Sequence, residues 1–266
     1  MANKTLPAKN LVSIIIPVFA QEKTICQDLS QINQTMKTTR FNYELIAVID
    51  GLEKDRSFTK AKRLKLPNLR VVGYKKNQGK GYAVRYGMAR ALGNRIAFID
   101  AGMDIDPNGI SMILEHMTWY KADIIVGSKR HLASKVDYPL TREIMSRVYH
   151  RLVWLLFGIR VSDTQAGLKV FRRTVLEKVL PRMLVKEFAF DVELLAIAKS
   201  LGFDQIYEAP IRLDRKRFKF SSTIKFETIF EMLWNTLAVF YRLKILHYYD
   251  GQNWRAWPID PKLKIN

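Results

Sequence analysis

The sequence predicts an α/β protein with a doubly wound sheet, and two observations support this fold class. Short apolar, β-branched runs alternate about five times with helix-length segments, and an acidic residue or a glycine ends several of the runs. The first two runs, at residues 11–17 and 43–50, are largely apolar, which is typical of strands buried on both faces of a parallel sheet. With 266 residues, the chain is long enough for one large domain, or for one domain with an appendage.

The remaining elements follow in order along the chain. Helices are expected at residues 22–37, 55–66, 81–92 and 107–120, and further strands at residues 69–73, 95–100 and 123–127. The later half is expected to contain an amphipathic helix at residues 141–157, a strand at 166–171, a helix at 192–201 and a strand at 206–213.

The C-terminal segment differs from the rest in composition. Residues 222–249 mix aromatic, aliphatic and charged side chains, which predicts one or two amphipathic helices with an aromatic face. We therefore divide the chain into a main domain, residues 1–221, and a helical, aromatic-rich extension suited to face a membrane, residues 222–266.

The chain is strongly basic. It has 44 Lys and Arg against 25 Asp and Glu, a formal net charge of +19, and its 48% of apolar residues exclude an intrinsically disordered chain. Such a surplus predicts a polyanionic partner, which is a nucleic acid, an anionic membrane surface or a phosphate-bearing substrate. A single cysteine, Cys26, excludes an internal disulfide and a zinc cluster.

No segment predicts a membrane span or a secretion signal. The longest uncharged apolar runs, at residues 152–159 and 232–241, are shorter than the roughly 18 to 20 residues that cross a bilayer. The apolar run near the N-terminus contains Pro17 and lacks a small-residue cleavage pattern. We therefore expect no secretion.

Polar residues at the ends of predicted strands mark a candidate site. Asp50, Asp100 and Gly127 end three strands, and such sheets bind ligands outside the carboxyl ends of their strands, so these residues should meet at one crevice. Asp100 and Asp104 are spaced to hold a divalent cation through oxygen ligands, which leaves positions for a diphosphate. Asp106 directly precedes a proline and is expected to cap the next helix.

The stretch NQGKGYA at residues 77–83 predicts a second part of the same crevice. Gly79 and Gly81 would let backbone amides approach an anion at the start of a helix, and Lys80 adds a positive charge. The spacing matches neither a P-loop nor a dinucleotide fingerprint. The turn GSKRH, at residues 127–131, adds further cations after another strand.

Eight sequence stretches, taken together, carry a family resemblance. They are SIIIPVFAQE (13–22), VID (48–50), NQGKGYA (77–83), FIDAGMDIDP (98–107), GSKRH (127–131), DTQAGLKVFRR (163–173), FAFDVELL (188–195) and EAPIRL (208–213). In this order they resemble the inverting family 2 glycosyltransferases of GT-A fold, and within them the polyprenyl-phosphate sugar synthases, over roughly residues 11–223. The stretches at 163–173 and 188–195 look most like dolichyl-phosphate β-glucosyltransferases. The resemblance implies a GT-A, Rossmann-like, doubly wound mixed sheet.

The resemblance also implies residues on the donor side of a site. The nucleotide base and ribose would lie beside Pro17, Phe19, Glu22 and Asp50. The diphosphate and a Mg²⁺ or Mn²⁺ ion would lie beside Asp100, Ala101, Gly102 and Asp104, with Asp100 and Asp104 as the metal ligands. Further substrate contacts are expected from Gly79, Lys80 and Gly81.

Other residues are implied on the acceptor side. Lys129, Arg142 and Arg217 match positions that would contact phosphates, and Asp163 and Gln165 fall in a loop near the transferred sugar. The candidates for catalytic residues are Asp100, Asp163, Lys129, Arg142 and Arg217.

The chain departs from the family pattern at several positions. The middle aspartate of the family's Asp-x-Asp signature is Gly102, the second aspartate of a pair is Gly51, and a glycine and a lysine are lost after Arg217. A nucleotide-sugar-binding module with impaired catalysis therefore stays an alternative.

We predict a glycosyltransferase that moves a hexose from a nucleotide sugar to a polyprenyl phosphate, with UDP-glucose favoured over GDP-mannose. A divalent cation and basic side chains would stabilise the charge of the departing diphosphate. An acceptor phosphate is largely ionised at neutral pH and needs no general base. A saccharide hydroxyl would need one, for which Asp163 is the candidate, so a saccharide acceptor stays open.

Charge and apolar residues near the acceptor side also predict a location. Residues 129–182 carry 12 Lys and Arg against 4 Asp and Glu, next to the apolar residues 154–157. This combination suits docking on an anionic bilayer, so we expect a peripheral enzyme on the cytoplasmic face of a membrane. The alternative places residues 154–157 in the core. Nucleic acid is not an expected partner, because the sequence lacks RNA-recognition, helix-turn-helix and finger motifs.

Overall fold

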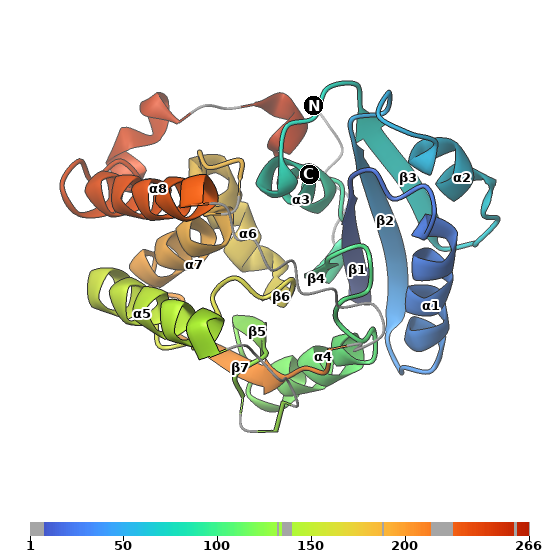
Figure 1. Cartoon of the computed structure of the whole chain (residues 1–266), viewed down its shortest axis with the longest axis horizontal. Helices are drawn as coiled ribbons and strands as arrows, with labels where there is room; N and C mark the ends of the chain where they lie inside the picture. The colour runs from blue at the N-terminus through green and yellow to red at the C-terminus, as the bar shows by residue number, and fades with distance from the viewer. Residues whose placement is uncertain are drawn as a thin grey trace.

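A computed structural model of the chain describes residues 8–131, 133–134, 140–187, 189–213, 226–257 and 260–265 (Figure 1). Its strands are β1 (Ala8–Val18), β2 (Asn42–Asp50), β3 (Leu69–Tyr74), β4 (Gly93–Ile99), β5 (Ile124–Ser128), β6 (Leu168–Arg172) and β7 (Ile206–Pro210). They form one sheet in the order β3-β2-β1-β4-β6-β5-β7. Neighbours are parallel except at β6, which is antiparallel to both β4 and β5. The predicted doubly wound mixed sheet is confirmed.

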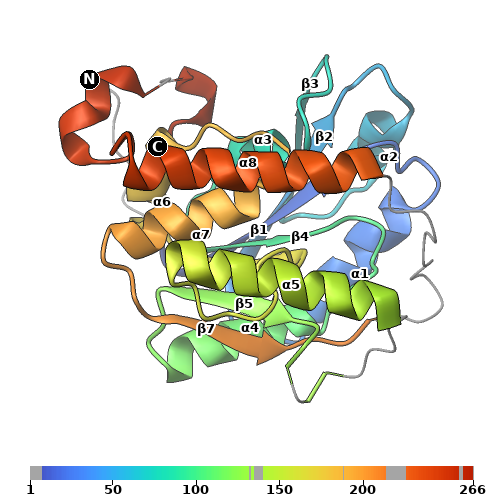
Figure 2. The same cartoon turned by 60° about the vertical axis from the view of Figure 1, so that its left-hand side comes forward.

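Helices cover both faces of this sheet. They are α1 (Ile25–Lys37), α2 (Ser57–Arg63), α3 (Lys80–Met88), α4 (Gly109–Trp119), α5 (Leu140–Phe157), α6 (Arg173–Val179), α7 (Phe190–Ser200) and α8 (Phe226–Lys244). Apolar residues of α1, α2 and α4 form a core on one face, and those of α3, α5, α6, α7 and α8 form a core on the other (Figures 1 and 2). Alternation along the strands feeds both cores: in β1, Ile15 points to the second core, and Ile14 and Ile16 point to the first.

The predicted helices and strands match the structure closely, with two exceptions. No helix is expected at residues 173–179, where α6 begins directly after β6; a helix of seven residues is too short to show a clear period. The predicted cap of α4 is also wrong, because the helix begins at Gly109 with Asn108 as its N-cap residue. Asp106 Oδ1 instead accepts hydrogen bonds of 2.9 Å from the backbone N and the side-chain Nδ2 of Asn108. Asp106 therefore shapes the turn before the cap.

The C-terminal helix packs against the main body. Val239 and Leu243 of α8 and the following Tyr249 belong to the same core as α7. Tyr249 is 1% exposed, and its hydroxyl donates a hydrogen bond of 2.8 Å to Oε1 of the buried Glu193. Glu193 also accepts hydrogen bonds from the backbone N of Leu184, so one carboxylate joins α7, the loop before it and the segment after α8. Among the described residues, no helix is long and apolar enough to cross a bilayer.

We expect the Tyr249→Phe substitution to lower the free energy of unfolding by about 1–3 kcal/mol, because it leaves a buried carboxylate with one donor fewer. Urea unfolding of the full chain measures this change. Tyr241→Phe is the matched control, since Tyr241 is 52% exposed on α8. Equal stability of the two variants would contradict the role of the Tyr249 hydroxyl.

Candidate active site

Asp50, at the end of β2, binds the loop that starts α3. Its Oδ1 accepts a hydrogen bond of 2.7 Å from Gln78 N and its Oδ2 one of 3.1 Å from Gly79 N. Gly79 has φ +91°, a conformation that glycine adopts without strain. The prediction that these amides approach an external anion needs correction, because in this structure the Asp50 carboxylate already occupies them. The helix start thus faces a negative charge supplied by the protein itself.

Asp100 follows β4 and forms the centre of the crevice. Lys80, the first residue of α3, places Nζ 2.7 Å from Asp100 Oδ2. Asp100 N donates a hydrogen bond of 2.9 Å to Gly167 O, and a Cβ atom on Gly167 would collide with the Asp100 carboxylate. The other oxygen, Oδ1, is buried and has no hydrogen-bond partner among the described residues. This side chain is therefore tightly held, and its Oδ1 is open in the sense that it has no hydrogen-bond partner among the described residues.

A buried ion pair lies next to Lys80. Lys169 of β6 and Asp191 of α7 are joined by a contact of 2.6 Å between Nζ and Oδ1, with side chains 1% and 4% exposed. Burial lowers the pKa of Lys169 and raises the pKa of Asp191. Burial also opposes the charge of Lys80, but the carboxylates of Asp100 and Asp191 outweigh it and raise the pKa of this lysine. Lys80 therefore stays positively charged at the centre of the crevice.

Lys169 and Asp191 have no role among the sequence predictions. A signal for Lys169 is present in the sequence, because it is the only charged residue in the apolar run from Leu168 to Phe171. A lone charge at such a position is expected to have a buried partner.

Lys129 and Asp163 lie in contact with each other. Asp163 Oδ2 lies 3.7 Å from Lys129 Nζ and accepts a hydrogen bond of 3.3 Å from Lys129 N. Glu208 of β7 holds this loop, since its Oε1 accepts hydrogen bonds from Ser162 Oγ at 2.7 Å and from Asp163 N at 3.2 Å. The sequence analysis missed this positioning role of Glu208.

Gln165 connects the same loop to α8. Its Nε2 lies 2.9 Å from the sulfur of Met232. The C-terminal helix therefore contacts the loop in which the resemblance places the transferred sugar.

The turn after β4 carries the remaining acidic candidate. Gly102 has φ +93° and Met103 has φ +57°, so the chain turns sharply between Asp100 and Asp104. Gly102 N donates a hydrogen bond of 3.2 Å to Asp28 of α1, while Ala101 is half-buried. Partial burial raises the pKa of Asp104, and the neighbouring Asp100 raises it further. The two carboxylates are therefore close enough to interact.

The other donor-side candidates lie on loops that follow β1 and β2. Phe19 is 46% exposed, with Lys54 Nζ 5.9 Å from its ring centre, and Pro17 is half-buried. Glu22 accepts a hydrogen bond of 3.0 Å from Arg56 N, and Glu22 N donates one of 2.9 Å to Asp55. Glu22 thus ties the two loops together and leaves the Phe19 ring accessible.

The catalytic candidates Arg142 and Arg217 cannot be placed in the same way. Arg142 lies in the first turns of α5, and its side chain is outside the described part. Arg217 lies outside the described residues.

The crevice suits a divalent cation only in combination with a ligand. The described residues contain no group of three or more His, Cys, Asp or Glu that would hold a metal ion. The open Oδ1 of Asp100, together with Asp104, offers one or two carboxylates, which is the set by which Mg²⁺ is bound in proteins when substrate phosphates and water complete the shell.

Solved structures define the class of fold. Glucosyl-3-phosphoglycerate synthase from Mycobacterium tuberculosis, in complex with Mn²⁺, UDP-glucose and phosphoglyceric acid, gives a TM-score of 0.64 at 19% identity over 88% of this chain and 79% of that chain. Mannosyl-3-phosphoglycerate synthase from Rubrobacter xylanophilus gives 0.68 at 13% identity over 91% and 76% of the two chains. The fold is that of the GT-A glycosyltransferases.

Sequence comparison identifies the family. Residues 13–180 match the family described as Glycosyl transferase family 2. Dolichyl-phosphate beta-glucosyltransferase of Drosophila melanogaster is 32% identical over 206 residues, which is 71% of this chain and 63% of that protein. Dolichyl-phosphate beta-glucosyltransferase of Homo sapiens is 30% identical over 275 residues, 98% of this chain and 81% of that protein. The chain belongs to glycosyl transferase family 2, and the predicted enzyme class, a glycosyltransferase, is confirmed.

Glu187, beside Gly79, makes the stability of the protein depend on pH. Its carboxylate lies against Gly79, and burial together with the carboxylates of Glu231 and Asp50 raises its pKa. A raised pKa in the folded state means that stability falls as the pH rises through the ordinary and then the raised pKa. We expect Glu187→Gln to remove this loss, so the variant gains stability relative to the wild type between about pH 4 and pH 7.

Urea unfolding of both proteins at the two pH values measures this gain. The exposed Glu53→Gln is the control. A constant difference between Glu187→Gln and the wild type at both pH values would contradict the assignment.

Proposed function

We propose that this protein transfers glucose from UDP-glucose to a polyprenyl phosphate. The similarity to dolichyl-phosphate beta-glucosyltransferases supports glucose as the transferred sugar and a polyprenyl phosphate as the acceptor, and the chain spans 63% of the length of the Drosophila relative. The observation that carries the proposal is the crevice at the end of β4, where Asp100 keeps an open oxygen beside Lys80 and near Lys129. The two lysine side chains, together with a carboxylate oxygen that has no hydrogen-bond partner among the described residues, suit the binding of a nucleoside diphosphate and its metal ion.

The cations of the crevice would stabilise the leaving group. In the reaction, an oxygen of the acceptor phosphate forms a bond to the anomeric carbon, the bond from that carbon to the diphosphate breaks, and UDP leaves with the electron pair. Attack from the opposite side inverts the configuration. Lys80 and Lys129 would donate to the diphosphate oxygens as their charge grows, in positions that the protein fixes beforehand. A Mg²⁺ or Mn²⁺ ion held by Asp100 and Asp104 would supply further neutralising charge.

The contacts of Asp163 favour a phosphate acceptor over a saccharide hydroxyl. Its Oδ2 already accepts a hydrogen bond from Lys129 N and pairs with Lys129 Nζ. Asp163 therefore holds a cation in position, whereas a general base must face the proton that it removes. An acceptor phosphate is largely ionised at neutral pH and is already nucleophilic.

We expect Asp100→Asn to lower the rate of glucose transfer from UDP-glucose to a short polyprenyl phosphate by roughly 10²-fold or more, because it weakens the hold on Lys80 and on the divalent cation that would neutralise the leaving diphosphate. Transfer of radiolabelled glucose to the lipid phase, with Mg²⁺ or Mn²⁺ present, measures the rate. The control is Asp204→Asn, a surface residue that is 59% exposed.

A parallel assay with GDP-mannose tests the donor. Faster transfer of mannose from GDP-mannose than of glucose from UDP-glucose would contradict UDP-glucose as the donor. Binding of UDP-glucose without turnover by the wild-type protein would favour the alternative of an impaired nucleotide-sugar-binding module.

We further propose that the enzyme docks on an anionic membrane through α8 and α5. Four apolar side chains of α8 and one just after its last residue recur at helical spacing and are 48% to 68% exposed: Phe230, Trp234, Leu237, Tyr241 and Ile245. This stripe is opposite the buried Val239 and Leu243, so it is not part of the core. Helix α5 lies alongside α8 (Figure 2), joined by a hydrogen bond of 2.9 Å between the hydroxyls of Tyr149 and Thr236.

Helix α5 extends the apolar surface. Trp154 is 53% exposed and Leu155 is 74% exposed, whereas Phe157 is 7% exposed and packs edge-on against Phe240. Phe157 is thus part of the core, whereas Trp154 and Leu155 are exposed, which supports the proposal that they contact a membrane. Exposed cations border the surface at Arg151 and Lys244, which suits an anionic headgroup layer.

We expect the double substitution Phe230→Ala and Trp234→Ala to reduce co-flotation with anionic liposomes by roughly tenfold or more, since each side chain loses apolar contact with the bilayer. Trp119→Ala is the matched control, because Trp119 on α4 is 64% exposed and Trp234 is 65% exposed. Failure of the wild-type protein to co-float at low salt would remove the proposal.

A further inference from the structure

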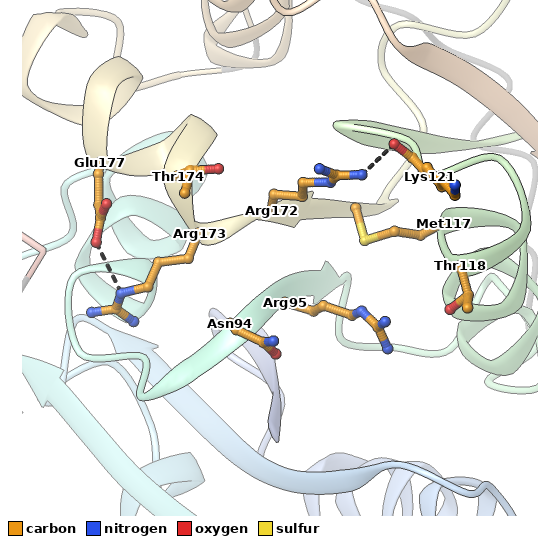
Figure 3. Close-up of a pocket in the computed structure, with 9 residues that line it drawn as sticks. All are labelled: Asn94, Arg95, Met117, Thr118, Lys121, Arg172, Arg173, Thr174 and Glu177. Atoms are coloured by element: carbon orange, nitrogen blue, oxygen red, sulfur yellow. Dashed lines mark hydrogen bonds and ion pairs between the residues drawn. The ribbon is translucent and has the colours of Figure 1, made fainter. Parts of the chain in front are cut away.

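A second pocket lies at the opposite end of the strands from the crevice. It has a volume of about 460 Å³ and is formed where β4 begins, β6 ends and α4 ends (Figure 3). Arg95 in this pocket is five residues before Asp100 on the chain, or roughly 17 Å along an extended strand. The pocket is therefore separate from the site proposed for sugar transfer.

Two arginines face each other across the floor of this pocket. Arg95 of β4 and Arg172 of β6 are directly paired in the antiparallel register. Like charges at directly opposed positions destabilise a sheet. Figure 3 shows both guanidinium groups pointing to the same end of the pocket, toward Lys121, while Arg173 turns the other way to Glu177. Burial lowers the pKa of Arg95 and the nearby Arg40 lowers it further, Glu115 opposes this, and Arg172 adds a smaller lowering.

The carboxylates around the pocket are engaged elsewhere. Glu115 forms a two-point contact with Arg40, at 3.0 Å and 2.6 Å. Glu177 lies 3.1 Å from Nε of Arg173. In the described part of the chain, the Arg95 guanidinium forms no hydrogen bond or ion pair and lies 5.2 Å from the ring centre of Phe41.

Arg172 is held differently from Arg95. Its Nε donates a hydrogen bond of 2.7 Å to Ala122 O, its Nη2 donates to Lys121 O, and Asp123 Oδ1 is 3.8 Å from its Nε. These contacts fix the guanidinium plane at the edge of the pocket.

From this arrangement we infer that the pocket binds a small phosphate-bearing anion between Arg95, Arg172 and Lys121. An anion there would separate two like charges that the strand register brings together. Guanidinium groups match phosphate oxygens in a two-point geometry, and the lysine adds a point charge. The volume exceeds that of a single phosphate, which leaves room for a diphosphate or a phosphorylated small molecule.

Isothermal titration with pyrophosphate tests this site independently of sugar transfer. Because the crevice also contains cations, the titration uses the Lys80→Gln protein as background. We expect Arg95→Gln in this background to weaken pyrophosphate binding roughly tenfold or more, as loss of a charge-assisted contact does. Arg63→Gln, an exposed arginine at the end of α2, is the control and should bind as the background does.

Three outcomes would overturn the inference: no binding by the Lys80→Gln protein, equal binding by Arg95→Gln, or an equal loss in Arg63→Gln. Circular dichroism checks that each variant folds. If Arg95→Gln does not fold, Lys121→Gln takes its place with the same expected loss, since Lys121 is exposed and forms no ion pair among the described residues.

Discussion

The buried ion pair between Lys169 and Asp191 is the contact on which the crevice depends. It joins the antiparallel strand β6 to α7 in a place where neither side chain reaches water. Loss of one partner of such a pair leaves an uncompensated charge in the core, at a cost of about 3–5 kcal/mol. The same pair sets the electrostatics next to it, because Asp191 helps to keep Lys80 charged. The Lys169–Asp191 pair therefore both holds β6 against α7 and acts on the charge of Lys80 in the crevice.

Other carboxylates of the crevice, at or near the carboxyl ends of the strands, are also held by groups of the protein. Three of the carboxylates are held by groups of the protein: Asp50 by backbone amides, Asp100 by Lys80 and Asp163 by Lys129. Such an edge is ordered before any ligand arrives, which reduces the reorganisation that a developing charge would otherwise require. An incoming diphosphate then competes with these carboxylates for their cations.

Most of the sheet could be predicted from the sequence, and the reasons for the rest are physical. The apolar runs of β1 and β2 identify buried strands, but an apolar run does not record direction, so nothing at residues 166–171 predicts that β6 is antiparallel. Asp50 and Asp100 could be placed at one edge of the sheet from the sequence, because each lies at the carboxyl end of a predicted strand and these ends form the ligand-binding crevice of such sheets.

The partners of these residues could not be predicted, because they depend on tertiary packing. Glycines at 79 and 81 indicate a loop that can accept an anion, yet the anion present is the protein's own Asp50. Lys169 and Asp191 are 22 residues apart, and only the insertion of β6 between β4 and β5 brings them together. Whether Trp154 or Phe157 is buried depends on where α8 lies, which no local pattern contains.

The turn at Gly102 limits which side chains this part of the crevice can carry. Its φ of +93° is poorly tolerated by any residue with a side chain, and its amide is bound to Asp28. An aspartate at this position would strain the backbone, although a Cβ atom there would meet only Gln21 Nε2 among the described residues, at 3.8 Å. A third carboxylate in the turn would therefore be obtained only at the expense of the geometry that now separates Asp100 from Asp104.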